Sequence, residues 1–114
     1  MVRLEDQRIL DLFELALSEW RCDGFVVWKS RPAEWLEANV EGHTTKSLAN
    51  LMYEYFQAGG KVDQTREHRD TYASYYEFHY DFRFSINGRR IYIETVLDET
   101  RTGPTITIVS MHDE

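Results

Sequence analysis

Alternating apolar and polar residues between positions 78 and 86 are the clearest structural signal in this chain. The apolar members of the alternation are Phe78, Tyr80, Phe82, Phe84 and Ile86. A period of two is typical of a strand with one buried face. Asn87-Gly88 follows, and both residue types tolerate the positive φ angles of a two-residue type I′ turn. That turn places the apolar side chains of 78–86 and 89–97 on one face, so pattern and turn predict the same hairpin register.

The other face of this predicted hairpin carries polar side chains. The register places Asp81 opposite Glu94 and Arg83 opposite Tyr92. Directly opposed carboxylates repel each other, but His79 and Arg83 flank Asp81 within reach of both acids. One interpretation is a solvated face with weak ion pairs, each contributing about 0–1 kcal/mol. The other is a site in which paired acids transfer protons, or in which His79, Asp81 and Glu94 bind a divalent ion.

Helical periodicity before residue 60 predicts three helices. The first is amphipathic and covers residues 4–22, ending at Asp23-Gly24. A shorter helix runs from about Pro32 to Val40, with the proline at its first position. The third covers residues 45–58, with Thr44 as its N-cap and Gly59-Gly60 at its exit.

Other segments allow more than one interpretation. Phe25 to Trp28 is either an edge strand or a buried connector, and Lys61 to Gln64 could add a short strand. Residues 98–104 have the composition of a turn or loop.

Residues 105–111 predict a final strand, whose register the sequence leaves open. If Ile106 and Ile108 face the core, simple alternation puts Ser110 and His112 on the same side. A slip of one residue would instead place Ser110 and His112 beside Glu94 and Tyr92.

Together these patterns predict a single α+β domain over residues 1–114. Two to three N-terminal helices would pack on one face of a C-terminal antiparallel meander of about three to four strands. The apolar content of 42% suits a globular protein, and no apolar run is long enough to cross a membrane. The single cysteine, Cys22, and the lack of a signal-peptide pattern predict a cytoplasmic location.

Charge limits the partners that this chain can recruit. The chain has 13 Lys and Arg residues and 20 Asp and Glu residues, which gives a net charge of −7. An acidic surface opposes non-specific binding of nucleic acid. A local cluster of cations and stacking groups nevertheless has the composition that single-stranded nucleic acid binds, namely Arg66, His68, Arg69, Tyr72, Tyr75 and Tyr76. The alternative is a surface segment whose tyrosines cover the edge of the sheet.

Residues 78–112 resemble the C-terminal portion of the RelE-like small toxin superfamily, which includes BrnT-type and MqsR-type ribonucleases. The likeness lies in the long hairpin and the final strand of the Ile-Thr-Ile-Val-Ser-Met-His type. The resemblance implies helices on one face of a sheet, an RNA-binding or catalytic surface on the other, metal-free cleavage of RNA, and inhibition by a cognate antitoxin.

Chemistry assigns candidate catalytic roles on the polar face of the hairpin. Arg83 could stabilise the charge that develops on a phosphate, with His79 or Glu94 as base. Tyr92 or His112 could donate the proton. Asp81 would join the binding surface, and we predict neither a cofactor nor a resident metal, because the usual motifs are missing.

Two hypotheses about function therefore follow from the sequence. The first is a toxin-like endoribonuclease or an inactive relative of one. The second is a non-enzymatic acidic interaction protein, such as an immunity protein or an antitoxin, which binds a basic protein partner. An exposed edge strand could also pair two copies of the chain into a dimer.

Overall fold

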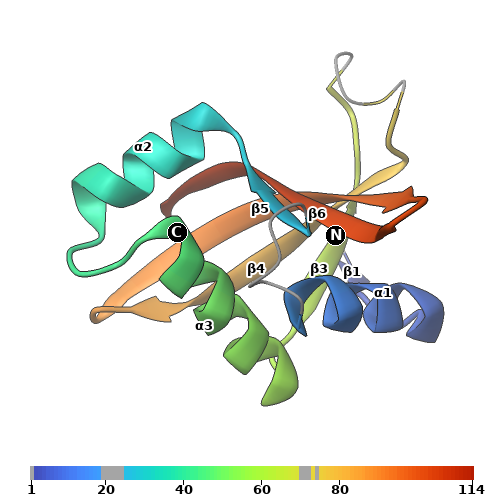
Figure 1. Ribbon diagram of the computed structural model, residues 1–114, viewed down its shortest axis with the longest axis horizontal. Coiled ribbons are helices and arrows are strands. Elements are labelled where there is room, and N and C mark those ends of the chain that lie inside the picture. Colours follow the sequence, from blue (N-terminus) through green and yellow to red (C-terminus); the bar gives the residue numbers. More distant parts are fainter. Residues whose placement is uncertain (1, 19–24, 70–72, 74) are drawn as a thin grey trace.

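A computed structural model describes residues 2–18, 25–69, 73 and 75–114, and in it helices and strands are interspersed along the chain. The helices are α1 (Gln7–Ser18), α2 (Ser30–Asn39) and α3 (Thr45–Gln57). The strands are β1 (Val2–Arg3), β2 (Val26–Trp28), β3 (Val62–Arg66), β4 (Phe78–Ile86), β5 (Arg89–Thr100) and β6 (Gly103–Asp113). Figure 1 shows α1 and α3 lying across one face of the sheet and α2 running beside β6.

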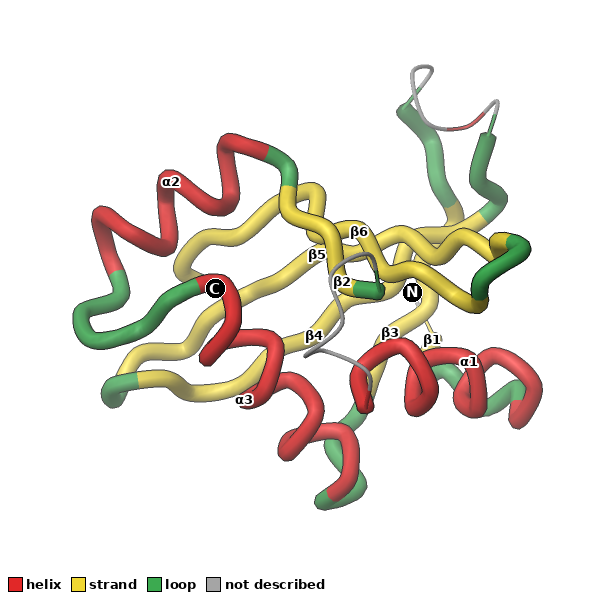
Figure 2. Tube along the Cα trace, viewed as in Figure 1, coloured by secondary structure: helices red, strands yellow, loops and turns green. Residues whose placement is uncertain are grey.

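The six strands form one mixed sheet in the order β1-β3-β4-β5-β6-β2 (Figure 2). Neighbouring strands are antiparallel except β2, which pairs in parallel with β6 through Val26 and Ile106. The predicted fold class is therefore wrong in two respects. Strands precede and separate the helices, and the sheet is larger than a three- to four-stranded meander and not wholly antiparallel.

Short edge strands account for both errors. β1 has two residues and β2 has three, so neither is long enough to show a period of two. Periodicity also reports which face a side chain takes, and carries no information about which strand lies alongside. Phe25 to Trp28, which the sequence left open, contains the edge strand β2, and the suspected strand at Lys61 to Gln64 overlaps β3.

The central hairpin has the predicted register from Tyr80–Thr95 to Ile86–Arg89. Asn87 and Gly88 have φ angles of 53° and 76°, as the type I′ turn requires. The turn is tied to the helical layer, because Asn87 Nδ2 donates to the carbonyl of Glu41 at 2.8 Å. The predicted loop at 98–104 is shorter than expected, since β5 continues to Thr100 and β6 begins at Gly103.

The starts of α1 and α2 differ from the predicted ones, whereas α3 starts at the predicted residue. α1 begins at Gln7, and Asp6 Oδ1 accepts a hydrogen bond from the N–H of Arg8. α2 begins two residues before Pro32. Thr44 is the predicted N-cap of α3 and forms a capping box with Ser47. The predicted stop at Asp23-Gly24 lies outside the described residues.

The core fills the space between the helices and the apolar face of the sheet. Phe13 of α1 packs edge-on against Tyr80, with ring centroids 5.1 Å apart, and lies 5.9 Å from the ring of Phe82. Tyr55 of α3 stacks on Phe84 at 4.8 Å. No helix in the described part of the chain combines the length and apolarity needed to cross a membrane.

A β-bulge resolves the register that the sequence left open in β6. Thr95 pairs with Ile108 and the adjacent Glu94 pairs with Ser110, so Val109 is an extra residue without a partner in β5. Ile108 consequently faces the core, while Ser110 lies beside Glu94 on the polar face. Ile106 and Ile108 face the core as the first alternative had it, but Ser110 and His112 lie beside Glu94 and Tyr92, as the second alternative had it.

Candidate functional site

Three carboxylates lie in one row across the polar face of the sheet. β3 pairs with β4 at Asp63 and Asp81, and β4 pairs with β5 at Asp81 and Glu94. The side chains of this row point away from the helical layer. Asp81 and Glu94 are nevertheless buried, with 2% and 7% of their surface exposed. Because a buried carboxylate costs free energy unless it is hydrogen-bonded or paired, the groups around this row define the candidate site.

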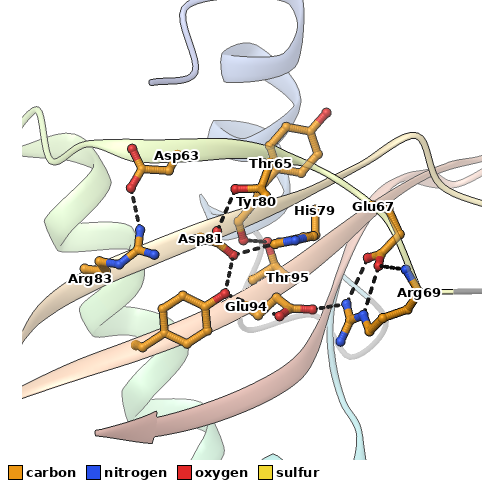
Figure 3. A network of polar contacts seen from close by, with 11 residues as sticks. Asp63, Thr65, Glu67, Arg69, His79, Tyr80, Asp81, Arg83, Glu94 and Thr95 are labelled. Carbon is orange, nitrogen blue, oxygen red and sulfur yellow. Dashed lines mark hydrogen bonds and ion pairs between the residues drawn. The ribbon is translucent and has the colours of Figure 1, made fainter. Parts of the chain in front are cut away.

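Asp81 accepts hydrogen bonds from side chains on both sides of β4 (Figure 3). Thr65 Oγ1 donates to its Oδ2 at 3.0 Å, and Tyr92 Oη donates to its Oδ1 at 2.8 Å. His79 Nδ1 also lies 2.9 Å from Oδ1. These contacts satisfy the carboxylate and fix the orientation of the imidazole ring.

Arg69 crosses from the end of β3 to β5 and joins two further buried carboxylates. Its side chain makes two hydrogen bonds to Glu67, at 2.9 and 2.8 Å, and also pairs with Glu94. Its backbone N–H donates to Glu67 Oε1 at 3.0 Å. Glu67 is only 6% exposed. Glu67 and Arg69, which follow β3, thus cover part of the polar face (Figure 3).

Arg83 and Tyr92 occupy the adjacent row. The Arg83 guanidinium pairs with Asp63 at 2.5 Å and with Glu114 at 3.1 Å, and its Cζ lies 4.9 Å from the centre of the Tyr92 ring. On its other side, Tyr92 stacks on His112 with ring centroids 4.7 Å apart. Arg83 is therefore held by two carboxylates and an aromatic face.

Electrostatics in this network fix the protonation states of two groups, Glu67 and Tyr92. Hydrogen bonds from the Arg69 side chain lower the pKa of Glu67 to about 2. Burial raises the pKa of Tyr92 far above its usual value, and the hydrogen bond to Asp81 raises it further. Groups that exchange protons in catalysis work best with a pKa near the operating pH. Glu67 and Tyr92 are moved away from that range.

Glu67, His79 and Glu94 could also hold a metal ion. A ligand atom from each lies within 4.8 Å of the others. Carboxylate oxygen and imidazole nitrogen suit several divalent ions, and Asp81 orients the histidine as an outer-shell carboxylate does in metal sites. Arg69, however, already bridges Glu67 and Glu94 and compensates their charge. These three residues differ from the predicted metal ligands, which were His79, Asp81 and Glu94.

The structure brings the five predicted catalytic residues together but divides the predicted binding residues. The catalytic set lies on the polar face of β4, β5 and β6, namely His79, Arg83, Tyr92, Glu94 and His112. Of the binding set, Asp81 and Arg69 join this network. Arg66 instead pairs with Glu77 and lies over the ring of Phe78. Tyr75 and Tyr76 line a cleft beside α1. His68 is exposed, and Tyr72 lies outside the described residues.

Sequence reasoning missed Glu67, although it is central to the network. Asp63 and Thr65 alternate onto the polar face of β3, and the same period carries on to Glu67. Once β3 is recognised as a strand, this alternation predicts the position of Glu67. Asp63 and Glu114, the partners of Arg83, were missed for the same reason, since their strands had no fixed register.

The arrangement is chemically a closed set of charges. Among the described residues, every buried side-chain nitrogen and oxygen has a hydrogen-bond partner. Arg69, Arg83 and Arg90, which lie on this face, are each paired with a carboxylate of the same chain. Such a set stabilises one arrangement of the strands and offers little to a phosphate.

No protein-family model, curated protein or solved structure matches this chain.

Proposed function

We propose that this protein is a non-enzymatic acidic binding protein whose partner is a basic protein, in the manner of an immunity protein or an antitoxin. The observation that carries the proposal is the state of Arg83. This residue was the best candidate to stabilise a phosphate, and its guanidinium is engaged by Asp63 and Glu114.

Net charge supports the same conclusion. The arginines on the sheet face are neutralised by carboxylates of the same chain, and the chain as a whole carries a net charge of −7. Exposed carboxylates remain on the helical layer and its flanks, among them Glu5, Asp11, Glu14, Glu34 and Glu37. Charge complementarity of this kind speeds association with a basic protein and disfavours acidic ones.

A toxin-like ribonuclease related to the RelE superfamily is the competing hypothesis. This hypothesis requires a cationic side chain that is free to contact phosphate. It also requires a general base and a general acid whose pKa values lie near neutrality. The ion pairs of Arg83 and Arg69 and the raised pKa of Tyr92, a candidate proton donor, give it less support.

Two measurements test the proposal. The purified chain should leave RNA intact, and its expression should not arrest growth. RNA cleavage that disappears in the Arg83→Ala variant would overturn the proposal in favour of the ribonuclease.

Co-expression with the products of neighbouring genes provides the positive test. We expect a basic protein to co-purify, and the complex to weaken as NaCl rises from about 0.05 M to about 0.5 M, because salt screens exposed charges. A partner that is itself acidic, or a complex indifferent to salt, would contradict the proposal.

A further inference from the structure

A cleft of about 350 Å³ opens beside the N-terminus of α1, away from the polar network of the sheet. Its aromatic side chains come from the end of the segment before β4 and from β4 itself, namely Tyr75, Tyr76, Phe78 and Tyr80. Tyr75 is 81% exposed, while Tyr80 is buried. The volume is at the lower end of the range of ligand pockets, about 300–1,000 Å³, and suits one long side chain better than a whole helix.

Carboxylates surround this aromatic cleft. Asp6, Glu77 and Glu99 line it, against a single arginine of the lining, Arg8. Burial raises the pKa of the Tyr80 hydroxyl, and the charges of Asp6 and Glu77 raise it further. The cleft therefore combines ring faces with a negative potential, and both features attract a cation.

The chain's own arginines demonstrate this chemistry at the cleft. The Cζ atom of Arg66 lies 5.2 Å from the centre of the Phe78 ring, and its Nη2 lies 3.6 Å from Oε1 of Glu77. Arg8 pairs with Glu99 at 2.9 Å. The side chains of both pairs are more than half exposed, so each pair is weak and can exchange for a competing cation.

We infer that this cleft receives an arginine side chain of the basic partner, an inference that rests on the proposed function and gives it a location. Arginine fits better than lysine, because its planar guanidinium stacks on an aromatic ring while it donates to a carboxylate. The partner's arginine would lie against Tyr75 and Phe78, with Asp6 and Glu77 as its counter-charges.

The test uses the full chain and a defined probe. The peptide acetyl-Gly-Gly-Arg-Gly-Gly-amide is titrated while backbone amide shifts are followed by NMR, and a peptide with citrulline in place of arginine is the neutral control. We expect the arginine peptide to shift amides of residues 75–80 and 97–99, and the citrulline peptide to leave them in place.

Matched variants separate the cleft from charge in general. Asp6→Asn with Glu77→Gln removes two carboxylates, and asparagine can still cap α1. Glu34→Gln with Glu41→Gln makes the same change in charge at exposed positions elsewhere. We expect the first double variant to weaken the peptide by about fivefold to tenfold and the second to leave its affinity unchanged. Tyr75→Ala should weaken it as well, and circular dichroism checks that each variant is folded.

The other outcomes overturn the inference. The inference is wrong if the amide shifts lie away from the cleft or if both double variants lose the same affinity for the peptide. It is also wrong if the arginine and citrulline peptides bind equally well. None of these results bears on the proposed function, which is tested by the RNA assay and by the salt-sensitive complex. Conversely, the arginine peptide could bind at the cleft while no basic protein co-purifies. That combination would support an arginine site and contradict the proposed function.

Discussion

Asp81 and Glu94 lie directly opposite each other on β4 and β5, and both carboxylates are buried. Tyr92 lies between them, with its hydroxyl 2.8 Å from Asp81 and 3.3 Å from Glu94. The single proton of that hydroxyl goes to Asp81 at the shorter distance. Glu94 is then left to Arg69, so the stability of this face depends on a residue from the segment between β3 and β4.

Replacing Arg69 with alanine should therefore destabilise the fold. The change leaves Glu67 and Glu94 buried without a cation, which we expect to cost about 1–3 kcal/mol, below the usual loss for a buried pair because Arg69 is itself 46% exposed. Urea unfolding measures the free energy.

The matched control is Arg90→Ala, since Arg90 is exposed and pairs with Glu114 at 3.1 Å. We expect a loss of less than about 1 kcal/mol there. Adding Glu94→Gln to Arg69→Ala should recover part of the stability. Equal losses for Arg69→Ala and Arg90→Ala would show that the buried carboxylates do not need Arg69.

The Arg69→Ala variant should also gain affinity for a divalent ion. Without the guanidinium, Glu67, His79 and Glu94 present ligand atoms within 4.8 Å of one another, and among the described residues neither carboxylate has another ion pair. Calorimetry with Zn²⁺ and Mn²⁺ should show binding to this variant and little binding to the parent chain.

Adding Glu94→Gln to the Arg69→Ala variant is the control, and it should abolish binding because it removes a ligand. If the parent chain bound the ion as tightly as the variant, Arg69 would not be the competitor of the metal.

Stability should fall in acid through Glu67. The pKa of this carboxyl drops from 4.5 to about 2 on folding, so its contribution is complete above pH 4.5 and is lost as the pH falls toward 2. A shift of this size corresponds to at most about 3 kcal/mol.

Urea unfolding of the parent chain and of Glu67→Gln between pH 2 and 6 tests this. The parent should be more stable at pH 6, and the difference should shrink toward pH 2. A difference that is independent of pH would mean that the ionised carboxylate is not what stabilises this segment.

Local patterns predicted the parts of the fold that short-range chemistry determines. Asn87-Gly88 and the alternation of 78–86 together specify the hairpin, because a slip by one residue would turn every side chain to the wrong face. The capping chemistry of Thr44 located the start of α3 in the same way.

Long-range pairing explains what the sequence did not predict. Val26 pairs in parallel with Ile106, which lies 80 positions further along the chain. The three residues of β2 contain no local pattern that predicts this partner. The candidate site was half predicted for the same reason. Residues of the hairpin were identified, whereas Glu67, Asp63 and Glu114 entered only with the register of β3 and β6.

Val109 is a residue whose position in the bulge could not be predicted from the alternation of β6. As the extra residue of the bulge, it separates the half of β6 that contains Ile108 from the half that contains Ser110. Deleting Val109 would leave an unbroken ladder in which Ile108 still faces the core, Ser110 still faces Glu94, and Met111 stays buried. We therefore expect this deletion to cost far less than a deletion in the regular part of β6.

Deletion of Thr107 is the matched comparison. It would turn either Ile106 or Ile108 out of the core, and burying such a side chain contributes about 1.5–3 kcal/mol, so the loss should be severe. Urea unfolding of the two deletion variants measures the difference, and amide NMR of the Val109 deletion shows whether Ser110 keeps its place. If both deletions were equally damaging, the bulge would contribute more than an extra residue, because its added twist would then be needed to bring β6 against β2 and α2.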